Sequence, residues 1–353
     1  MSINFRQMRS YSNKATVIIP NWNGKSHLRI CLDALSVQEY TNFEVIVVDN
    51  GSSDGSVELI RKAYQWVKLI RFDCNQGFAE GCNAGIAESQ AEYIVLLNND
   101  TKPSPDWIGE LIRFMDSASP DVACLSSKML RLDQPDLIDD AGDFLTWRGG
   151  AFKRGHGEKK ELYDLVEEVM SPCAGAALYR RTVFEKLGGM DQTFFAYLED
   201  VDLGLRIRLA GYRCIFIPTA IVYHVGHGSS LPHEQYIFLT SRNRLFIYIK
   251  NIPAILLLIH FGSIVYGWVF YFLAFGLHKS YLKGTLSFFK FLPVMLKKRR
   301  AVRSQTELNT TDIDALLSSE WPEISLLTLS RDYIQAHLVS IHKWWVLVRG
   351  KAN

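Results

Sequence analysis

The strongest constraint on the fold is a regular alternation of short apolar runs and amphipathic segments over the first hundred residues. Four runs rich in β-branched and other apolar residues are predicted to be strands: Thr16–Pro20, Phe43–Asp49, Val67–Phe72 and Tyr93–Leu97. Three segments with helical spacing of apolar or small residues lie between them: Lys25–Val37, Gly55–Tyr64 and Phe78–Ser89. Strands that alternate with helices in this way are typical of a parallel sheet covered on both faces. We therefore predict an α/β fold for this part of the chain.

Polar residues stand at the carboxyl ends of these predicted strands. Asn21 follows the first strand, Asp49 ends the second, and Asn98-Asn99-Asp100 follow the fourth. Ligands of such sheets bind beyond the carboxyl ends of the strands. An acid at a strand end can accept hydrogen bonds from a base or ribose, and in addition Ser53 or Asp54 is expected to cap the following helix. No GxGxxG motif follows the first strand, which disfavours a dinucleotide oxidoreductase.

Asp100 and a later histidine are candidate metal ligands. A carboxylate with neighbouring amides can bind Mg²⁺ or Mn²⁺ together with substrate phosphates, and so neutralise a departing diphosphate. The alternative is an ordinary turn after the strand. His224, in the run Val222-Tyr-His-Val, can complete such a site or contact phosphate, although a lone histidine is more often simply hydrogen-bonded.

The segment Asn75–Gly85 combines three glycines with a predicted helix. Glycine lowers helix stability, so close packing is the expected reason for its presence. The sequence leaves open whether the packing partner is a ligand or a strand.

An acidic cluster, Glu199, Asp200 and Asp202, lies beside an apolar stretch. Close carboxylates raise one another's pKa unless something compensates. Asp202 can pair with Arg206 at helical i, i+4 spacing, which leaves Asp200 freer to act as a general base. A solvated helix start is the alternative interpretation.

Composition excludes some classes of protein. The net charge of +2 gives no expectation of nucleic acid as the main partner. The six cysteines form no CxxC pair, which favours buried, reduced thiols in a cytoplasmic protein. Residues 1–14 are polar and lack the apolar core of a signal peptide, so we expect none.

The character of the chain changes after residue 245. No charged residue occurs between Lys250 and Lys279, and Ile252–Leu277 is long enough to cross a bilayer. A crossing would place the basic segment that ends at Arg303 outside, against the positive-inside tendency. Gly262-Ser263 beside His260 favours a break, so we expect a re-entrant or in-plane hairpin, with a buried soluble helix pair as the alternative. Helical apolar spacing over residues 331–348 predicts an interfacial helix.

Taken in order, these motifs resemble those of the inverting family 2 glycosyltransferases with the GT-A fold, across roughly residues 15–245. The matching segments are Pro20–Asn23, Val48–Gly55, Asn75–Gly85, Leu97–Asp100, Cys173–Ala176 and Glu199–Asp202. Within the family, the chain is most similar to bacterial rhamnosyltransferases that build cell-envelope polysaccharide. The Asn-x-Gly-Phe segment, a Tyr-His near the domain end and the segment Arg242-Asn-Arg-Leu245 carry this likeness.

The resemblance implies a role for each matching position. Asp200 becomes the catalytic general base, and Asp100 and His224 become metal ligands. The donor-binding residues it implies are Pro20, Asn21, Asn23, Asp49, Asn50, Ser52, Asp54, Asn75, Gly77, Phe78, Asn83, Asn98 and Asn99. The acceptor-side residues it implies are Cys173, Ala174, Gly175, Ala176, Glu199, Asp202 and Arg206. The metal motif begins with Asn98 where the family has Asp, so only Asp100 supplies charge there.

For the whole chain, the resemblance implies transfer of L-rhamnose from dTDP-β-L-rhamnose to a lipid-linked saccharide, with Mg²⁺ or Mn²⁺, in cell-wall or O-antigen synthesis. The rival donors are UDP-galactofuranose and UDP-GlcNAc, and a non-catalytic nucleotide-sugar-binding scaffold is the alternative from another class. We expect an N-terminal extension (1–14), a GT-A domain (15–245) and a helical, membrane-associated region (246–353). The expected location is the cytoplasmic face of the bacterial inner membrane, peripheral or monotopic. Homo-oligomerisation stays open.

Overall fold

The computed structural model describes residues 13–226, 231–275 and 277–319. The chain divides into two compact units. One comprises the residues up to Phe144, Ala151–Leu231 and Arg300–Asn309; the other comprises Leu145–Gly150, Pro232–Arg299 and the residues from Thr310 onward. The predicted domain boundaries, 15–245 and 246–353, stay a prediction, and a short segment from elsewhere in the chain joins each compact unit.

The first unit opens with the predicted alternation of strands and helices. Its elements are β1 (Ala15–Asn21), α1 (Lys25–Ser36), β2 (Phe43–Asp49), α2 (Ser56–Ala63), β3 (Lys68–Arg71), α3 (Phe78–Ala87) and β4 (Tyr93–Leu97). The four strands pair in parallel in the order β4-β1-β2-β3, with Ile18 opposite Ile46 and Leu96. Because all four run in one direction, their carboxyl ends share one edge. The predicted α/β fold is confirmed here.

Later strands extend this sheet with mixed directions. They are β5 (Thr101–Pro103), β6 (Val122–Arg131), β7 (Ile138–Asp140), β10 (Glu167–Val169), β11 (Ala176–Arg180) and β12 (Arg213–His224). β11 runs antiparallel between β4 and β6, and β12 lies parallel to β6. A separate pair, β8 (Asp143–Leu145) and β9 (Ala151–Lys153), and the short 3₁₀ helices η1 (Lys160–Leu162) and η2 (Gln192–Phe194) complete this region.

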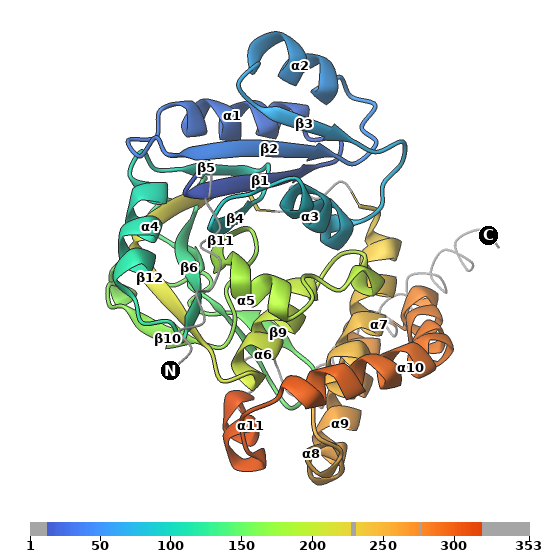
Figure 1. The fold of residues 1–353 in the computed structure, drawn as a ribbon. Coiled ribbons are helices and arrows are strands. Elements are labelled where there is room, and N and C mark those ends of the chain that lie inside the picture. The colour runs from blue at the N-terminus through green and yellow to red at the C-terminus, as the bar shows by residue number, and fades with distance from the viewer. Residues whose placement is uncertain (1–12, 227–230, 276, 320–353) are drawn as a thin grey trace, which may run out of the picture. The chain divides into compact units, whose positions relative to one another are not determined.

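Helices cover both faces of the sheet, because successive strand residues point to opposite sides. Val17 and Ile19 face a core formed with α1, α2 and α4 (Trp107–Ser117). Ile18 faces the other core, formed with α3, α5 (Arg181–Lys186) and α6 (Glu199–Leu209). Figure 1 shows α1 and α3 on opposite sides of β1 and β2.

The second unit is helical. It contains α7 (His233–Asn251), α8 (Ala254–Ile259), α9 (Phe261–Ala274), most of α10 (Lys279–Gln305) and α11 (Thr310–Leu316). The part of α10 after Arg299 belongs to the first unit. An aromatic core joins α7, α9 and α10 through Ile237, Phe270, Tyr271 and Tyr281. The Tyr281 hydroxyl donates to the Trp268 carbonyl at 2.8 Å, which satisfies a polar group that would otherwise be costly to bury.

The uncharged segment Ile252–Leu277 is broken, as predicted. His260 separates α8 from α9, and its ring stacks on Trp147 with centroids 3.7 Å apart. His260 Nε2 also lies 2.8 Å from Asp314 Oδ1. Among the described helices, none combines the length and apolar character needed to cross a membrane. The interfacial helix predicted over residues 331–348 lies outside the described residues.

The six cysteines all lie in the described part of the chain and are unpaired. Cys31, Cys82, Cys124 and Cys214 are buried, and Cys173 is half-buried. Cys74 departs from the prediction of buried thiols, because it lies in the exposed loop between β3 and α3.

Candidate active site

The polar strand ends of β1, β2 and β4 meet in one hydrogen-bonded network. The Asn21 amide donates to Asp49 Oδ1 at 3.2 Å, and the Asn99 amide donates to Asn21 Oδ1 at 2.7 Å. Asp49 Oδ2 accepts from the Ser52 backbone amide at 3.0 Å. Asn21 and Asp49 are each about 1% exposed, so these bonds rather than water hold them. The network fixes three strand ends relative to one another, at the edge where such sheets bind ligands.

Asn23 and Asp54 hold the loop that follows β2. Asn23 has a left-handed φ of 51°, and its side chain accepts from the Ser53 amide at 2.8 Å. Asp54 accepts from the Lys25 amide at 2.8 Å and from the Ser56 amide at 3.0 Å. Burial would raise the pKa of Asp54, but the hydrogen bonds from Ser56 and Lys25 outweigh it and lower the pKa. Asp54 therefore stabilises the starts of α1 and α2, as predicted for a capping residue. Donor contacts for both residues stay a prediction.

Close packing explains the glycines of the Asn75–Gly85 segment. A Cβ on Gly85 would lie 2.5 Å from the Ile18 side chain, so α3 can approach β1 only with glycine there. Gly77 has a φ of 93°, and a Cβ there would collide with the Phe195 carbonyl. A Cβ on Gly81 would touch Pro20 at 3.4 Å. Gly85 and Gly81 thus pack against residues of β1, and contact of this segment with a ligand stays open.

Three side-chain amides hold this segment in place. Asn50 accepts from the Gln76 amide at 2.8 Å and donates to the Gly77 carbonyl at 3.0 Å. Asn75 accepts from the Gly77 amide at 2.9 Å. Asn83 exchanges two hydrogen bonds with the Met190 backbone, and Phe78 packs partly buried against the second core. These contacts shape the loop above β2; their use in donor binding stays a prediction.

Asp100 and His224, the predicted metal ligands, are neighbours. The antiparallel pairing of β5 with β12 sets His224 opposite Thr101, and His224 Nε2 lies 3.3 Å from Asp100 Oδ1. The other ring nitrogen, Nδ1, lies 2.8 Å from Asp139 Oδ2. Burial would lower the pKa of His224, but the two carboxylates raise it to about 9. Burial would raise the pKa of Asp100, but its contact with His224 outweighs burial and lowers that pKa.

This pair fits a hard divalent cation. Ligand atoms about 2.1 Å from an octahedral ion lie about 3.0 Å apart at adjacent positions, close to the 3.3 Å between Asp100 Oδ1 and His224 Nε2. One carboxylate oxygen and one imidazole nitrogen suit Mn²⁺ or Mg²⁺ with substrate oxygens completing the shell. Asn98 supplies no charge to the pair, and its carbonyl accepts from the Thr101 hydroxyl at 2.6 Å.

Asp200 is held at the start of α6 by backbone amides. Its Oδ2 accepts from the Ala174 amide at 3.1 Å, and its Oδ1 accepts from the Val201 amide at 2.8 Å. The neighbouring Gly175 carbonyl accepts from the Asn98 amide at 2.9 Å. Burial raises the pKa of Asp200, although these amides partly offset it. The predicted base is thus joined to the end of β4 through the segment Cys173–Ala176.

The other members of the acidic cluster are engaged inside the protein. Arg206 donates to Asp202 at 2.9 Å, as the i, i+4 spacing predicts, and also to the Leu187 and Gly189 carbonyls. Asp202 is fully buried. Glu199 is 5% exposed, its Oε2 has no hydrogen-bond partner among the described residues, and burial raises its pKa well above the usual value. Acceptor contacts for these three residues stay a prediction, and the solvated helix start does not describe them.

Sequence reasoning missed a second carboxylate group beside Asp200. Ligand-type atoms of Asp140, Asp143 and Cys173 all lie within 4.8 Å of one another. Burial, the dominant cause, raises the pKa of both carboxyls, and Asp140 Oδ2 has no hydrogen-bond partner within the described part of the chain. Two buried carboxyls this close favour the protonated form of one of them. The signal in the sequence was three acids in the small, apolar run Ile138-Asp-Asp-Ala-Gly-Asp143.

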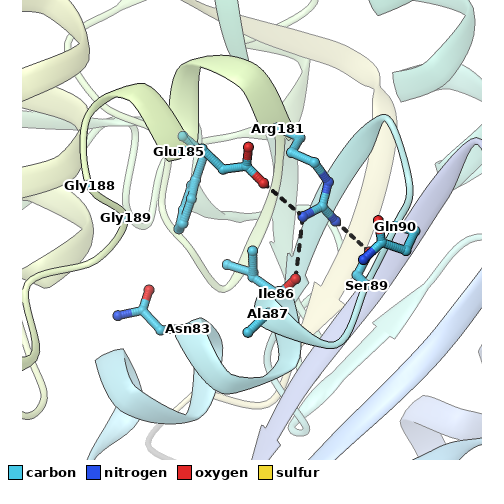
Figure 2. A pocket seen from close by; sticks show the side chains of 10 residues that line it. Asn83, Ile86, Ala87, Ser89, Gln90, Arg181, Glu185, Gly188 and Gly189 are labelled. Carbon is cyan, nitrogen blue, oxygen red and sulfur yellow. Dashed lines mark hydrogen bonds and ion pairs between the residues drawn. The ribbon is translucent and has the colours of Figure 1, made fainter. Parts of the chain in front are cut away.

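A surface pocket lies elsewhere, between α3 and the α5 region (Figure 2). Asn83 is the one predicted site residue that lines it. The Arg181 guanidinium in its wall donates to the Ile86 carbonyl and the Glu185 carboxylate, both at 3.3 Å. Because these protein groups already occupy its donors, the pocket offers little to a ligand and we assign it no role.

Together, the fold and the site define a GT-A-like α/β protein with its polar groups gathered at the strand ends. Residues 16–188 match the family model described as Glycosyl transferase family 2. The chain therefore carries a glycosyltransferase family 2 domain, as its motifs predict.

Named relatives agree with this assignment. The chain is 26% identical over 265 residues to N-acetylglucosaminyl-diphospho-decaprenol L-rhamnosyltransferase of Mycobacterium tuberculosis, an alignment covering 64% of this chain and 84% of that protein. It is 28% identical over 240 residues to O-antigen biosynthesis protein RfbC of Myxococcus xanthus, covering 63% of this chain and 18% of RfbC. The chain thus spans most of one curated relative but a quarter or less of others.

A solved structure supports the fold alone. The structure of GalNAc-T7 with UDP, GalNAc and Mn²⁺ superposes with a TM-score of 0.56 at 15% identity. The match covers 69% of this chain and 49% of that one.

Proposed function

We propose that this protein is an inverting glycosyltransferase that moves L-rhamnose from dTDP-β-L-rhamnose to a hydroxyl of a lipid-linked saccharide. The observation that carries the proposal is the placement of Asp200. Its carboxylate is desolvated, held by two backbone amides and tied through Gly175 to the strand end that leads to Asp100. A half-buried carboxylate fixed beside a donor-side network suits a one-step displacement.

In that step, Asp200 accepts the proton of the acceptor hydroxyl while the hydroxyl oxygen forms a bond to the anomeric carbon. The bond from that carbon to the diphosphate oxygen breaks, and the nucleoside diphosphate leaves with the electron pair. The raised pKa of Asp200 favours the transfer, because a more basic carboxylate takes the proton more readily. One displacement at carbon converts the β-linked donor to an α-rhamnoside.

Asp100 and His224 are the residues that would hold Mg²⁺ or Mn²⁺. A divalent cation bound there would offset the charge that develops on the leaving diphosphate. Asp49, held by Asn21 and Ser52 at the end of β2, would accept hydrogen bonds from the pyrimidine base. The proposal of rhamnose is supported by the name of the mycobacterial relative, and the lipid-linked acceptor by the same name.

Donor choice predicts a specific thermal shift. Purified in detergent with Mn²⁺ or Mg²⁺, the protein is expected to melt at a higher temperature with dTDP-rhamnose than with UDP-galactofuranose or UDP-GlcNAc. A ligand at a hundred times its Kd stabilises the native state by about 2.7 kcal/mol. Differential scanning fluorimetry measures the shift.

The matched control is Asp100→Asn, which should lose the metal-dependent part of the shift. If only UDP-sugars raise the melting temperature, the donor is a UDP-sugar and the proposal of rhamnose is wrong. No shift with any donor would contradict donor binding and with it the proposed transferase activity.

We also propose that the second unit docks this protein on the cytoplasmic face of the bacterial inner membrane, as a peripheral or monotopic protein. Ile255, Leu258, Ile259 and Phe261 are each more than half exposed on α8 and the start of α9; we name these four residues the apolar patch. On α10, the exposed Leu286 and Phe289 lie among Lys279, Lys283 and Lys290. Exposed apolar side chains beside basic ones suit the surface of an anionic bilayer.

Vesicle flotation tests the docking. Wild-type protein is expected to float with vesicles that contain phosphatidylglycerol, and Leu258→Glu with Phe261→Glu should weaken binding by about tenfold or more, because each apolar side chain contributes about 1.5–3 kcal/mol when fully buried. The control is Leu165→Glu, which changes a residue 72% exposed in the first unit. Equal weakening by this control, or no flotation of wild type, would contradict the proposal.

A further inference from the structure

We propose that Asp139 is a positioning residue that orients His224 for a divalent cation, and that Lys153 fixes Asp139 in turn. The inference rests on the proposed metal site at Asp100 and His224, and it adds two residues that no sequence motif pointed to.

The geometry of the imidazole carries the proposal. His224 presents its two ring nitrogens to two different carboxylates, Nε2 to Asp100 at 3.3 Å and Nδ1 to Asp139 at 2.8 Å. An imidazole that binds a metal through one nitrogen usually gives the other N–H to a carboxylate or carbonyl, which sets both the tautomer and the ring orientation. Asp139 occupies that place: it leaves Nε2 as the nitrogen that faces Asp100.

Asp139 is itself held from three directions. Lys153 Nζ donates to Asp139 Oδ2 at 2.8 Å, the same oxygen that His224 approaches. His156 Nδ1 lies 2.8 Å from the Asp139 backbone carbonyl. The Asp139 side chain is 6% exposed and that of His224 is 11% exposed, so water is poorly placed to substitute for either partner. The imidazole therefore meets a carboxylate with little freedom to move.

The topology explains why residues so distant in the chain meet. β7, which carries Asp139, pairs with the carboxyl-terminal part of β6 around Met129 and Leu130. β12 runs parallel to β6 along the same stretch and ends at His224 opposite Arg131. Asp139 on β7 and His224 on β12 therefore both lie near the carboxyl end of β6. Lys153 arrives from β9, whose following residue Arg154 pairs with Gly142.

The same lysine argues against a cation at the neighbouring group of Asp140, Asp143 and Cys173. Burial would lower the pKa of Lys153, but Cys173 and the carboxylates of Asp139 and Asp140 keep it above its usual value, so its ammonium already supplies positive charge there. The orienting role therefore belongs to the Asp139 side of this segment.

A double-mutant cycle on Mn²⁺ binding tests the inference. The full-length protein is titrated with Mn²⁺, and the free ion is counted by electron paramagnetic resonance, which needs no donor and no turnover. Asp139→Asn is expected to raise the Kd for Mn²⁺ by about 10- to 100-fold. In a His224→Gln background the same change should alter the Kd by less than about twofold, since Asp139 acts through the imidazole.

The matched control is Asp136→Asn, which removes an exposed carboxylate paired only with Lys160 in the same segment and should leave the Kd unchanged. An equal loss from Asp139→Asn in both backgrounds, or no loss when His224→Gln does weaken binding, would overturn the positioning role alone. An unchanged Kd in His224→Gln, or no Mn²⁺ binding by wild type, would overturn the proposed metal site itself. Asp139→Glu, which keeps the charge but displaces it by one methylene, gives the same test if Asp139→Asn does not fold.

Discussion

Asp200→Asn should abolish most sugar transfer while leaving the fold and donor binding intact. Loss of a positioned general base costs about 10²- to 10⁴-fold in rate. Asparagine has one acceptor oxygen, so it can accept from either the Ala174 or the Val201 amide, which bind different oxygens of Asp200, and the start of α6 keeps one of these two hydrogen bonds. The measurement is the initial rate of nucleoside diphosphate release with a panel of lipid-linked acceptors, beside the donor-dependent thermal shift.

The pH profile of the wild type gives a second readout. Transfer needs the ionised carboxylate, and burial raises its pKa above 3.8, so the rate should fall with decreasing pH through a midpoint above that value. Asp136→Asn, an exposed carboxylate change, serves as the control and should transfer at the wild-type rate. If Asp200→Asn keeps more than about a tenth of the wild-type rate, the base lies elsewhere.

Asp202→Ala should destabilise the protein by about 3–5 kcal/mol, because it leaves the buried Arg206 guanidinium without its carboxylate. The two groups lie 2.9 Å apart and are 0% and 5% exposed. Alanine is the better helix former, so helix propensity opposes the loss rather than adding to it. Urea unfolding measures the change in free energy as a shift of the midpoint at constant slope.

An exposed ion pair offers the comparison. Lys68 and Glu88 lie 2.8 Å apart with side chains 45% and 56% exposed, so Glu88→Ala should cost less than about 1 kcal/mol. A loss for Asp202→Ala no larger than this would show that Arg206 is sufficiently held by the Leu187 and Gly189 carbonyls. The buried pair would then be of no special importance to stability.

The parts of this fold that could be predicted are those fixed by local pattern. β-Branched runs and helical spacing place β1 to β4 and α1 to α3 within two residues of their observed ends, because period alone sets which face is buried. The break at His260 followed from Gly262 and Ser263 in the same way. The later strands could not be predicted in this way, since contacts distant in sequence set β11 antiparallel between β4 and β6.

The candidate site likewise has a part that local pattern predicts and a part that it does not. Asn21, Asp49 and Asn99 were predicted to gather because each follows a parallel strand, and they share hydrogen bonds. The contact between Asp139 and His224 joins residues 85 positions apart, and no local pattern predicts that these two residues meet. Asp54 accepts from the first backbone amides of α1 and α2, and its predicted donor contact stays a prediction, since a short acid in a turn suits either role.

The segment Cys173–Ala176 acts as a spacer of fixed length. Two successive residues bind opposite partners: the Ala174 amide faces the Asp200 carboxylate, and the Gly175 carbonyl faces the Asn98 amide. Consecutive Cα atoms across a trans peptide are about 3.8 Å apart whatever their side chains. The bond lengths and angles of this short backbone segment therefore help to set the distance between Asp200 and the end of β4. The insertion of a single residue into this segment would alter that distance.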